Sequence, residues 1–139
     1  MRFIDANVFI HAFLNLKREL KPSEVQVKQA ARAMLNRIEN GEKVVTSVVH
    51  LSEVANVLEN YLSLPDQKTL FSSILMRKNI EVLEVKPADY LLAIEFTEKN
   101  NLGINDSLAV VLMQQKQVSE IYSFDKDFDS LDEITRVTN

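Results

Sequence analysis

Short runs of β-forming residues alternate with long amphipathic segments along the whole of this chain. The β-like runs span residues 2–6, 43–47, 80–85 and 120–124, with a fifth candidate at 134–138. The amphipathic segments span residues 23–41, 50–62, 65–79, 87–101 and 105–116. Strands that alternate with helices predict a parallel sheet with helices on both faces. We therefore expect an α/β fold, a three-layer α/β/α arrangement around a central, mostly parallel sheet of four to five strands.

Caps and prolines mark the helix boundaries in the sequence. Segment 23–41 opens on Ser23, a preferred N-cap residue, and ends at Gly41. Pro65 and Pro87 stand at first-turn positions of two further helices. Only two glycines and three prolines occur, so the loops must be short. No repeat or linker divides the 139 residues, and we expect a single domain over residues 1–139.

The composition excludes several classes of protein. The chain has no cysteine, which excludes disulfides, thiol nucleophiles and Cys-ligated zinc. No apolar run approaches the ~20 residues of a membrane span, and the first residues lack the pattern of a signal peptide. We therefore expect a cytoplasmic protein without a membrane partner. The net charge of −4 argues against binding nucleic acid by blanket neutralisation of phosphates. A carboxylate site that holds a divalent metal can still attract a phosphate.

Four acids stand where an α/β sheet places its ligand sites, outside the carboxyl ends of the strands. Asp5 ends the first β-like run, and Asp125 ends the run at 120–124. Glu53 and Asp106 lie early in two of the helices. We expect the four side chains to converge on one edge of the sheet from remote parts of the chain.

Each of these acids also has a structural interpretation. Asp5 could cap a helix at residues 6–13, and Asp106 could cap the helix that follows it or favour its dipole. Glu53 lies in a strongly apolar helix, where a solvated glutamate is the alternative. The occurrence of acids at nearly every position where this architecture puts a ligand site favours the site over separate caps.

The acidic stretch "YSFDKDFDSLDE", at residues 122–133, suggests a calcium loop at first sight. An EF-hand loop that begins at Asp125 requires Gly at its sixth position and a bidentate Glu at its twelfth. Those positions hold Ser130 and Arg136, and the arginine stands where the strongest calcium ligand should be. The sequence therefore excludes an EF-hand.

Converging carboxylates need either protons or a cation. Two carboxylates about 5 Å apart repel by roughly 3 kcal/mol at an effective dielectric near 20. The group must therefore share protons, with raised and coupled pKa values, or bind a metal. Oxygen ligands favour Mg²⁺ or Mn²⁺ over zinc, and such an ion suits phosphodiester hydrolysis. The two histidines, His11 and His50, fit core or interface positions, although His50 could reach the rim of the site.

The ordered set "FIDANVFI", "HLSEVANVL", "GINDSLAVVL" and "YSFDKDFD" resembles the PIN-domain family of metal-dependent ribonucleases, which includes the toxins of VapBC-type toxin–antitoxin pairs. The similarity covers nearly the whole chain. It implies a central parallel sheet and an acidic Mg²⁺ or Mn²⁺ site that cleaves RNA. It also implies a homodimer and a small antitoxin whose tail could occupy the acidic cleft. A toxin and an RNA-processing enzyme are both compatible with it.

The resemblance assigns roles to individual residues. The four acidic positions of the family, which carry catalysis and metal binding, correspond to Asp5, Glu53, Asp106 and Asp125. Asn7 and Ser123 match polar positions that support the first and last acids. Asp127 lies in a variable acidic tail and could act through a water or a second metal. Phe128 resembles an aromatic anchor that packs behind the last acid.

Two other classes of function are compatible with parts of this pattern. An aspartate-based phosphatase places its D-x-D after the first strand, whereas this chain has Asn7 at the second of those positions and its D-x-D near the C-terminus. A receiver-like domain needs a lysine after a late strand, and Lys126 between two acids is a poor match. The non-enzyme alternative is an RNA-binding or interaction module that keeps the fold without turnover, which the complete acid set disfavours.

Overall fold

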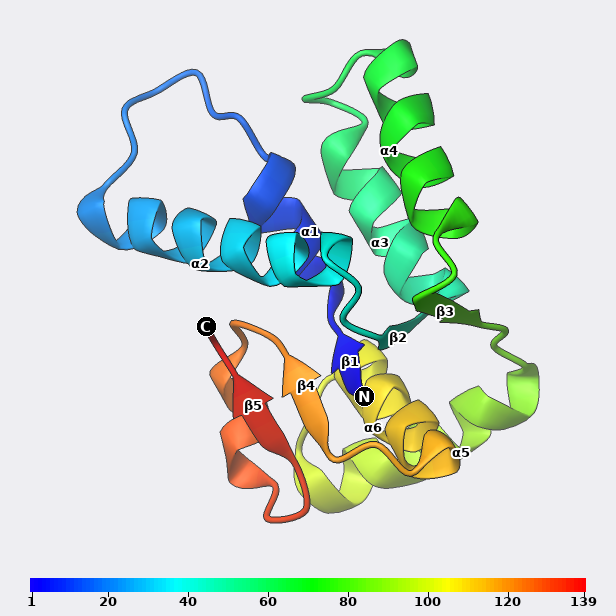
Figure 1. The fold of residues 1–139 in the computed structure, drawn as a ribbon. Coiled ribbons are helices and arrows are strands. Elements are labelled where there is room, and N and C mark those ends of the chain that lie inside the picture. The colour runs from blue at the N-terminus through cyan, green and yellow to red at the C-terminus, as the bar shows by residue number, and fades with distance from the viewer.

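A computed structural model describes all 139 residues (Figure 1). The strands are β1 (Arg2–Ile4), β2 (Val44–Ser47), β3 (Ile80–Leu83), β4 (Glu120–Tyr122) and β5 (Thr135–Val137). The α-helices are α1 (Ala6–Phe13), α2 (Pro22–Glu39), α3 (Val48–Leu58), α4 (Leu64–Met76), α5 (Pro87–Asn100) and α6 (Ile104–Lys116). A short 3-10 helix, η1 (Lys126–Ser130), follows β4.

The strands form one five-stranded sheet in the order β3-β2-β1-β4-β5, and every pair is parallel. The central strand β1 pairs with β2 through Phe3 opposite Val45 and with β4 through Phe3 opposite Ile121. The fifth candidate run forms the edge strand β5. The predicted α/β class with a parallel sheet is confirmed.

Alternating side chains along the strands separate two hydrophobic cores. Ile4, Val44 and Tyr122 point into a core shared with α1, α2, α3 and α4. Their chain neighbours Phe3, Val45 and Ile121 point into a second core shared with α5, α6 and η1. This period of two is the signature of strands that are buried on both faces. Figure 1 shows α1 to α4 on one side of the sheet and α5 and α6 on the other, the predicted three layers.

The predicted first-turn positions of Pro65 and Pro87 are confirmed, whereas α2 and α3 begin earlier than predicted. Helix α2 begins at Pro22, its N-cap is Lys21, and no side chain caps it, so the predicted Ser23 cap is wrong. Proline is favoured in the first helical turn because its missing N–H is not needed there, and this moves the boundary ahead of the serine. Helix α3 begins at Val48, where the Ser47 hydroxyl accepts the backbone N–H of His50. None of the helices combines the length and apolar character that crossing a membrane requires.

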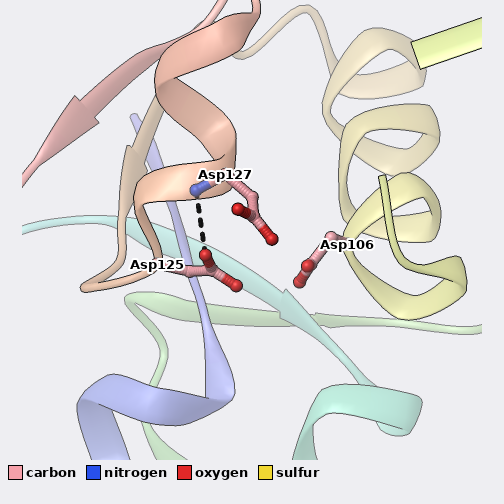
Figure 2. A group of neighbouring side chains, drawn as sticks. All are labelled: Asp106, Asp125 and Asp127. Carbon is pink, nitrogen blue, oxygen red and sulfur yellow. Dashed lines mark hydrogen bonds between the residues drawn. The ribbon is translucent and has the colours of Figure 1, made fainter. Parts of the chain in front are cut away.

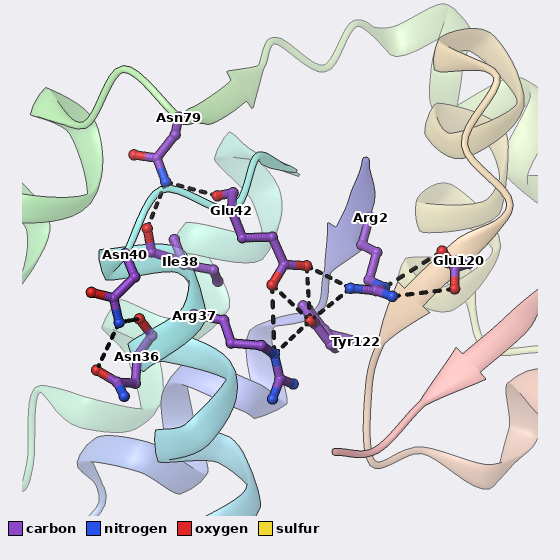
Figure 3. A network of polar contacts seen from close by, with 9 residues as sticks. All are labelled: Arg2, Asn36, Arg37, Ile38, Asn40, Glu42, Asn79, Glu120 and Tyr122. Carbon is purple, nitrogen blue, oxygen red and sulfur yellow. Dashed lines mark hydrogen bonds and ion pairs between the residues drawn. The ribbon is translucent and has the colours of Figure 1, made fainter.

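A network of charged and polar side chains lies at the end of the sheet where the strands begin (Figure 3). The buried Tyr122 hydroxyl lies 2.8 Å from Glu42 Oε1 and accepts hydrogen bonds from Arg2 and Arg37. Arg2 also pairs with Glu42 at 2.6 Å and with Glu120 at 3.5 Å. The network joins Arg37 of α2 to Arg2 and Glu120, the first residues of β1 and β4, and to Glu42, which precedes β2. Arg2 and Arg37 are thus engaged at the end of the sheet opposite the strand ends that carry the predicted site.

Candidate active site

The carboxyl ends of β1 and β4 form the point at which the strand order reverses. From β1 the chain proceeds to β2 and β3 on one side, and β4 and β5 occupy the other side. Loops that leave such neighbouring strands diverge to opposite faces and open a crevice between them, where α/β proteins bind ligands. Asp5 directly follows β1, and Ser123 and Asp125 follow β4. The topology therefore brings the first and last predicted acids to the same crevice.

Asp5 is a buried carboxylate that residues at the end of the neighbouring strand β4 hold in place. It occupies the N-cap position of α1, but its side chain accepts no capping hydrogen bond. Instead, Asp5 Oδ2 accepts the Ser123 hydroxyl at 2.7 Å, and the Asp5 N–H donates to the Tyr122 carbonyl at 3.0 Å. Only 6% of the residue is exposed. The side-chain cap interpretation of Asp5 is therefore wrong.

The Ser123 hydroxyl connects the two sides of the crevice. It donates to Asp5, accepts the Asn7 side-chain amide at 3.2 Å, and accepts the backbone N–H of Asp125 at 3.0 Å. A serine hydroxyl has one donor and two acceptor sites, so its capacity is fully used. Asn7 Oδ1 in turn accepts the Phe124 N–H at 3.3 Å. The family resemblance implied that Asn7 and Ser123 support the first and last acids, and in the structure Ser123 contacts both of them.

Asp106, Asp125 and Asp127 form a group in which one carboxylate oxygen of each residue lies within 4.8 Å of those of the other two. Asp106 lies in the first turn of α6, whose N-cap is Gly103, so the alternative of an Asp106 cap is wrong. Asp125 precedes η1, and its Oδ1 accepts the backbone N–H of Asp127 at 2.9 Å. Figure 2 shows the three side chains pointing toward a common space from α6 and η1. Three carboxylate oxygens at this spacing can share one cation.

The carboxylates of the crevice interact electrostatically. Burial raises the pKa of Asp5 to about 6, with further increases from the charges of Glu53 and Asp125, while the Ser123 hydrogen bond opposes them. Burial also raises the pKa of half-buried Asp106 to about 7, assisted by the charges of Asp5, Asp125 and Asp127. Desolvation and like charges both disfavour the ionised form. Without a cation, the site therefore retains protons close to neutral pH.

Glu53 is held by a residue that the sequence analysis did not identify. Its Oε1 accepts a hydrogen bond from the side-chain amide of Asn105, while Oε2 accepts none from the protein. Glu53 lies half-buried on α3, and Asn105 lies on α6 beside Asp106. The only sequence signal for Asn105 is its place before the acid in "GINDSL", which becomes informative once α3 and α6 are known to meet at the crevice.

The remaining candidates pack behind the crevice. Phe128 is fully buried in the second core, as an anchoring role requires. His50 is 2% exposed, its Nδ1 lies 2.7 Å from Ser47 Oγ, and its ring packs edge-on against Phe3. His11 packs edge-on against Phe124. His50 fits the core interpretation, whereas His11 is only half-buried.

Several solved structures have the same fold. VapC20 of Mycobacterium tuberculosis, described as a Sarcin-Ricin loop cleaving toxin, superposes with a TM-score of 0.72 and 16% identity over 94% of each chain. A toxin–antitoxin complex from Klebsiella pneumoniae gives 0.69 and 12% identity over 97% of this chain and 96% of the other. VapBC2 from Rickettsia felis, bound to a DNA fragment from its promoter, gives 0.63 and 11% identity over 98% and 96%. At these identities the likeness establishes the fold.

A comparison of the sequence with models of protein families assigns this chain to a family. None of the curated proteins matches it. The family model described as "PIN domain" matches residues 2–134, a span that includes all five acids of the crevice. The ordered motifs, the parallel sheet and the carboxylate crevice agree with this match. The chain belongs to the PIN domain family.

Proposed function

We propose that this protein is a divalent-metal-dependent ribonuclease that hydrolyses RNA phosphodiester bonds. The observation that carries the proposal is the group of Asp106, Asp125 and Asp127, with oxygens within 4.8 Å of one another, beside the buried Asp5. The PIN domain match and the fold shared with a toxin described as cleaving the Sarcin-Ricin loop support it.

The donor set fits Mg²⁺ or Mn²⁺. It consists of carboxylate oxygens, the ligands that hard cations prefer, and the chain has no cysteine. Asp106, Asp125 and Asp127 would hold the ion, and Asp5 would complete the set directly or through water. A bound divalent cation neutralises charge on the phosphate and makes water a stronger nucleophile near neutral pH.

The protein residues position the other reactants. Ser123 fixes the Asp5 carboxylate, and Asn105 fixes Glu53 through Oε1. Glu53 Oε2 is free to accept a hydrogen bond from the attacking water and to hold its proton. Asp5 and Glu53 would thereby orient the water for in-line attack on the phosphorus. The bond from the phosphorus to the leaving ribose oxygen breaks, and that oxygen takes up a proton from solvent. The three-aspartate group would hold the cation that neutralises the phosphate charge. Orientation of this kind accounts for a large part of enzymatic acceleration.

We also propose the biological setting of this activity. Two of the similar structures are toxin–antitoxin complexes, which supports a toxin role with a small antitoxin protein as partner, acting on RNA in the cytoplasm. Exposed apolar side chains on α5 (Leu91, Leu92 and Ile94) support a protein interface, and we propose that it joins a homodimer. The sheet shared by both cores supports a single domain over residues 1–139.

An RNA cleavage assay tests the proposal. We expect cleavage with Mg²⁺ or Mn²⁺, none with EDTA, and a loss of at least about 100-fold in Asp5→Asn and Asp106→Asn. Asp132→Asn is the matched control, because Asp132 is exposed and lies outside the group. Activity that survives in both site variants, or that does not depend on metal, would refute the mechanism and favour a binding module.

A further inference from the structure

A polar pocket adjoins the group of Asp106, Asp125 and Asp127. It has a volume of about 270 Å³ and no apolar lining residue. The end of α5 and the 3-10 helix η1 form its walls, and Asp127 belongs both to the pocket and to the carboxylate group. Its lining residues are Asn100, Asn101, Lys126, Asp127 and Ser130.

Lys126 provides the positive charge of this pocket. Its side chain is exposed, and it takes part in none of the seven ion pairs of the structure. Arg136, on the adjoining strand β5, is by contrast engaged, because Nε and Nη2 each lie 2.8 Å from an oxygen of Asp129. Lys126 is thus a free cation flanked in sequence by two acids of the site.

The other lining residues offer hydrogen-bonding groups of both kinds. Asn101 is exposed, and its side chain has no partner in the protein. The Asn100 side-chain amide donates to the Phe96 carbonyl at 3.1 Å, which leaves its oxygen as an acceptor. Ser130 donates to the Asp127 carbonyl at 2.9 Å and keeps its acceptor sites. Ribose hydroxyls and base edges likewise carry both donors and acceptors.

We propose that this pocket binds the nucleotide that adjoins the scissile phosphate in the RNA strand, and that Lys126 pairs with the phosphate of that nucleotide. This proposal rests on the proposed function. It implies that the RNA strand leaves the carboxylate group toward η1 and the end of α5. A strand that crosses a group of carboxylates carries further phosphates, and these are repelled unless a cation lies beside the group. Lys126 meets that need, and the amides of Asn100 and Asn101 contact the sugar or the base.

Two substitutions test the pocket without altering the fold. Lys126→Gln removes the charge, and Lys68→Gln is its control, an exposed lysine of α4 that also makes no ion pair. Asn101→Gly removes the amide at a residue whose φ is +52°, in the left-handed region that glycine adopts freely. Gln117→Gly is the matched control, because Gln117 has a φ of +56° and ends α6 as Asn101 ends α5.

The primary measurement is the affinity for a fluorescein-labelled single-stranded RNA dodecamer, followed by anisotropy in EDTA at several salt concentrations. We expect Lys126→Gln to weaken binding by about fivefold and to reduce the slope of log K against log salt by about 0.7. Asn101→Gly should weaken binding with an unchanged slope, because an amide contact releases no counterion. In the cleavage assay both variants should raise KM and leave kcat unchanged.

The outcomes separate this inference from the proposed function. RNA cleavage by a protein in which both variants bind like their controls would overturn the pocket alone. Weaker binding by Lys126→Gln in a protein that cleaves no RNA would support RNA binding at the pocket but refute the nuclease, and with it the place of the pocket beside a scissile phosphate. A wild-type protein that binds no RNA, or an equal loss in Lys68→Gln, would overturn the pocket.

Discussion

Ser123 Oγ lies 2.7 Å from Asp5 Oδ2, although 118 positions separate the two residues in the chain. The contact exists because β1 and β4 are parallel neighbours, with Ile4 opposite Tyr122, so the residues that follow them emerge side by side. The hydroxyl also accepts hydrogen bonds from Asn7 and from the Asp125 backbone. One buried hydroxyl thus holds both halves of the crevice.

Ser123→Ala should destabilise the fold and weaken metal binding. The substitution leaves two partly buried donors, the Asn7 amide and the Asp125 N–H, without their acceptor, at a cost of about 1–3 kcal/mol in unfolding free energy. It also removes the hydrogen bond that opposes the rise in the Asp5 pKa. We expect urea denaturation to show the loss and Mn²⁺ titration to show about tenfold weaker binding. Ser73→Ala, at an exposed helix position, should change stability by less than about 0.5 kcal/mol. Unchanged stability and unchanged Mn²⁺ affinity in Ser123→Ala would contradict this role.

The crevice could be predicted from the hydrophobic periodicity of the sequence and from the topology of a parallel sheet. Individual contacts that depend on how side chains of different helices pack could not be predicted. Alternating strands and helices are sufficient to predict a parallel sheet, and the ends of its strands then predict that Asp5 and Asp125 meet. The bond between Asn105 and Glu53 depends on how α3 and α6 pack, which no local pattern encodes. The inclusion of Asp127 beside Asp106 depends on η1, a turn too short to leave a periodic signal.

Removal of divalent metal should make stability depend on pH through Asp5 and Asp106. Their folded-state pKa values of about 6 and about 7 lie above the ordinary value near 4. The folded state therefore binds more protons than the unfolded state in the window from about pH 4 to about pH 7, and these groups stabilise the fold as pH falls. We expect the Tm of the metal-free protein to decrease as pH rises through this window, with a smaller decrease in Asp106→Asn.

Mn²⁺ should reverse this loss at neutral pH, because a ligand of the folded state at about 100 times its Kd adds about 2.7 kcal/mol. The Tm measured by calorimetry checks both effects, and Asp132→Asn is again the control. A metal-free Tm that is higher at neutral pH in wild type than in acid, together with no response to Mn²⁺, would contradict the carboxylate site.

His50 should produce the opposite pH dependence. Burial lowers its pKa to about 4, so between about pH 4 and about 6.5 the unfolded state binds more protons. The stability that neutral His50 contributes is therefore lost as pH falls through this window, by up to about 3 kcal/mol. We expect the stability difference between wild type and His50→Asn to shrink on acidification. His11→Asn should show a smaller effect, since His11 is only half-buried. A pH-independent difference for His50→Asn would contradict the buried neutral state.

Asn105 should act on catalysis through Glu53. Its amide holds Glu53 Oε1, and removal of that bond in Asn105→Ala leaves the glutamate free to turn away from the attacking water. We expect kcat to fall by about tenfold to 100-fold, with KM nearly unchanged because the amide makes no contact that RNA binding requires. Asn105→Asp should be worse, since it sets a second carboxylate against Glu53. Asn56→Ala, at an exposed position of α3, should leave both constants unchanged.

A double-mutant cycle separates this positioning role from a general structural one. If Asn105 acts through Glu53, then Asn105→Ala should cost little further activity in a Glu53→Gln background, because the group that it orients has already lost its function as a base. A structural role would instead lower kcat by the same factor in both backgrounds and would lower the Tm. Full additivity of the two losses in kcat would therefore show that Glu53 and Asn105 work independently, and the proposed water-orienting pair would have to be abandoned.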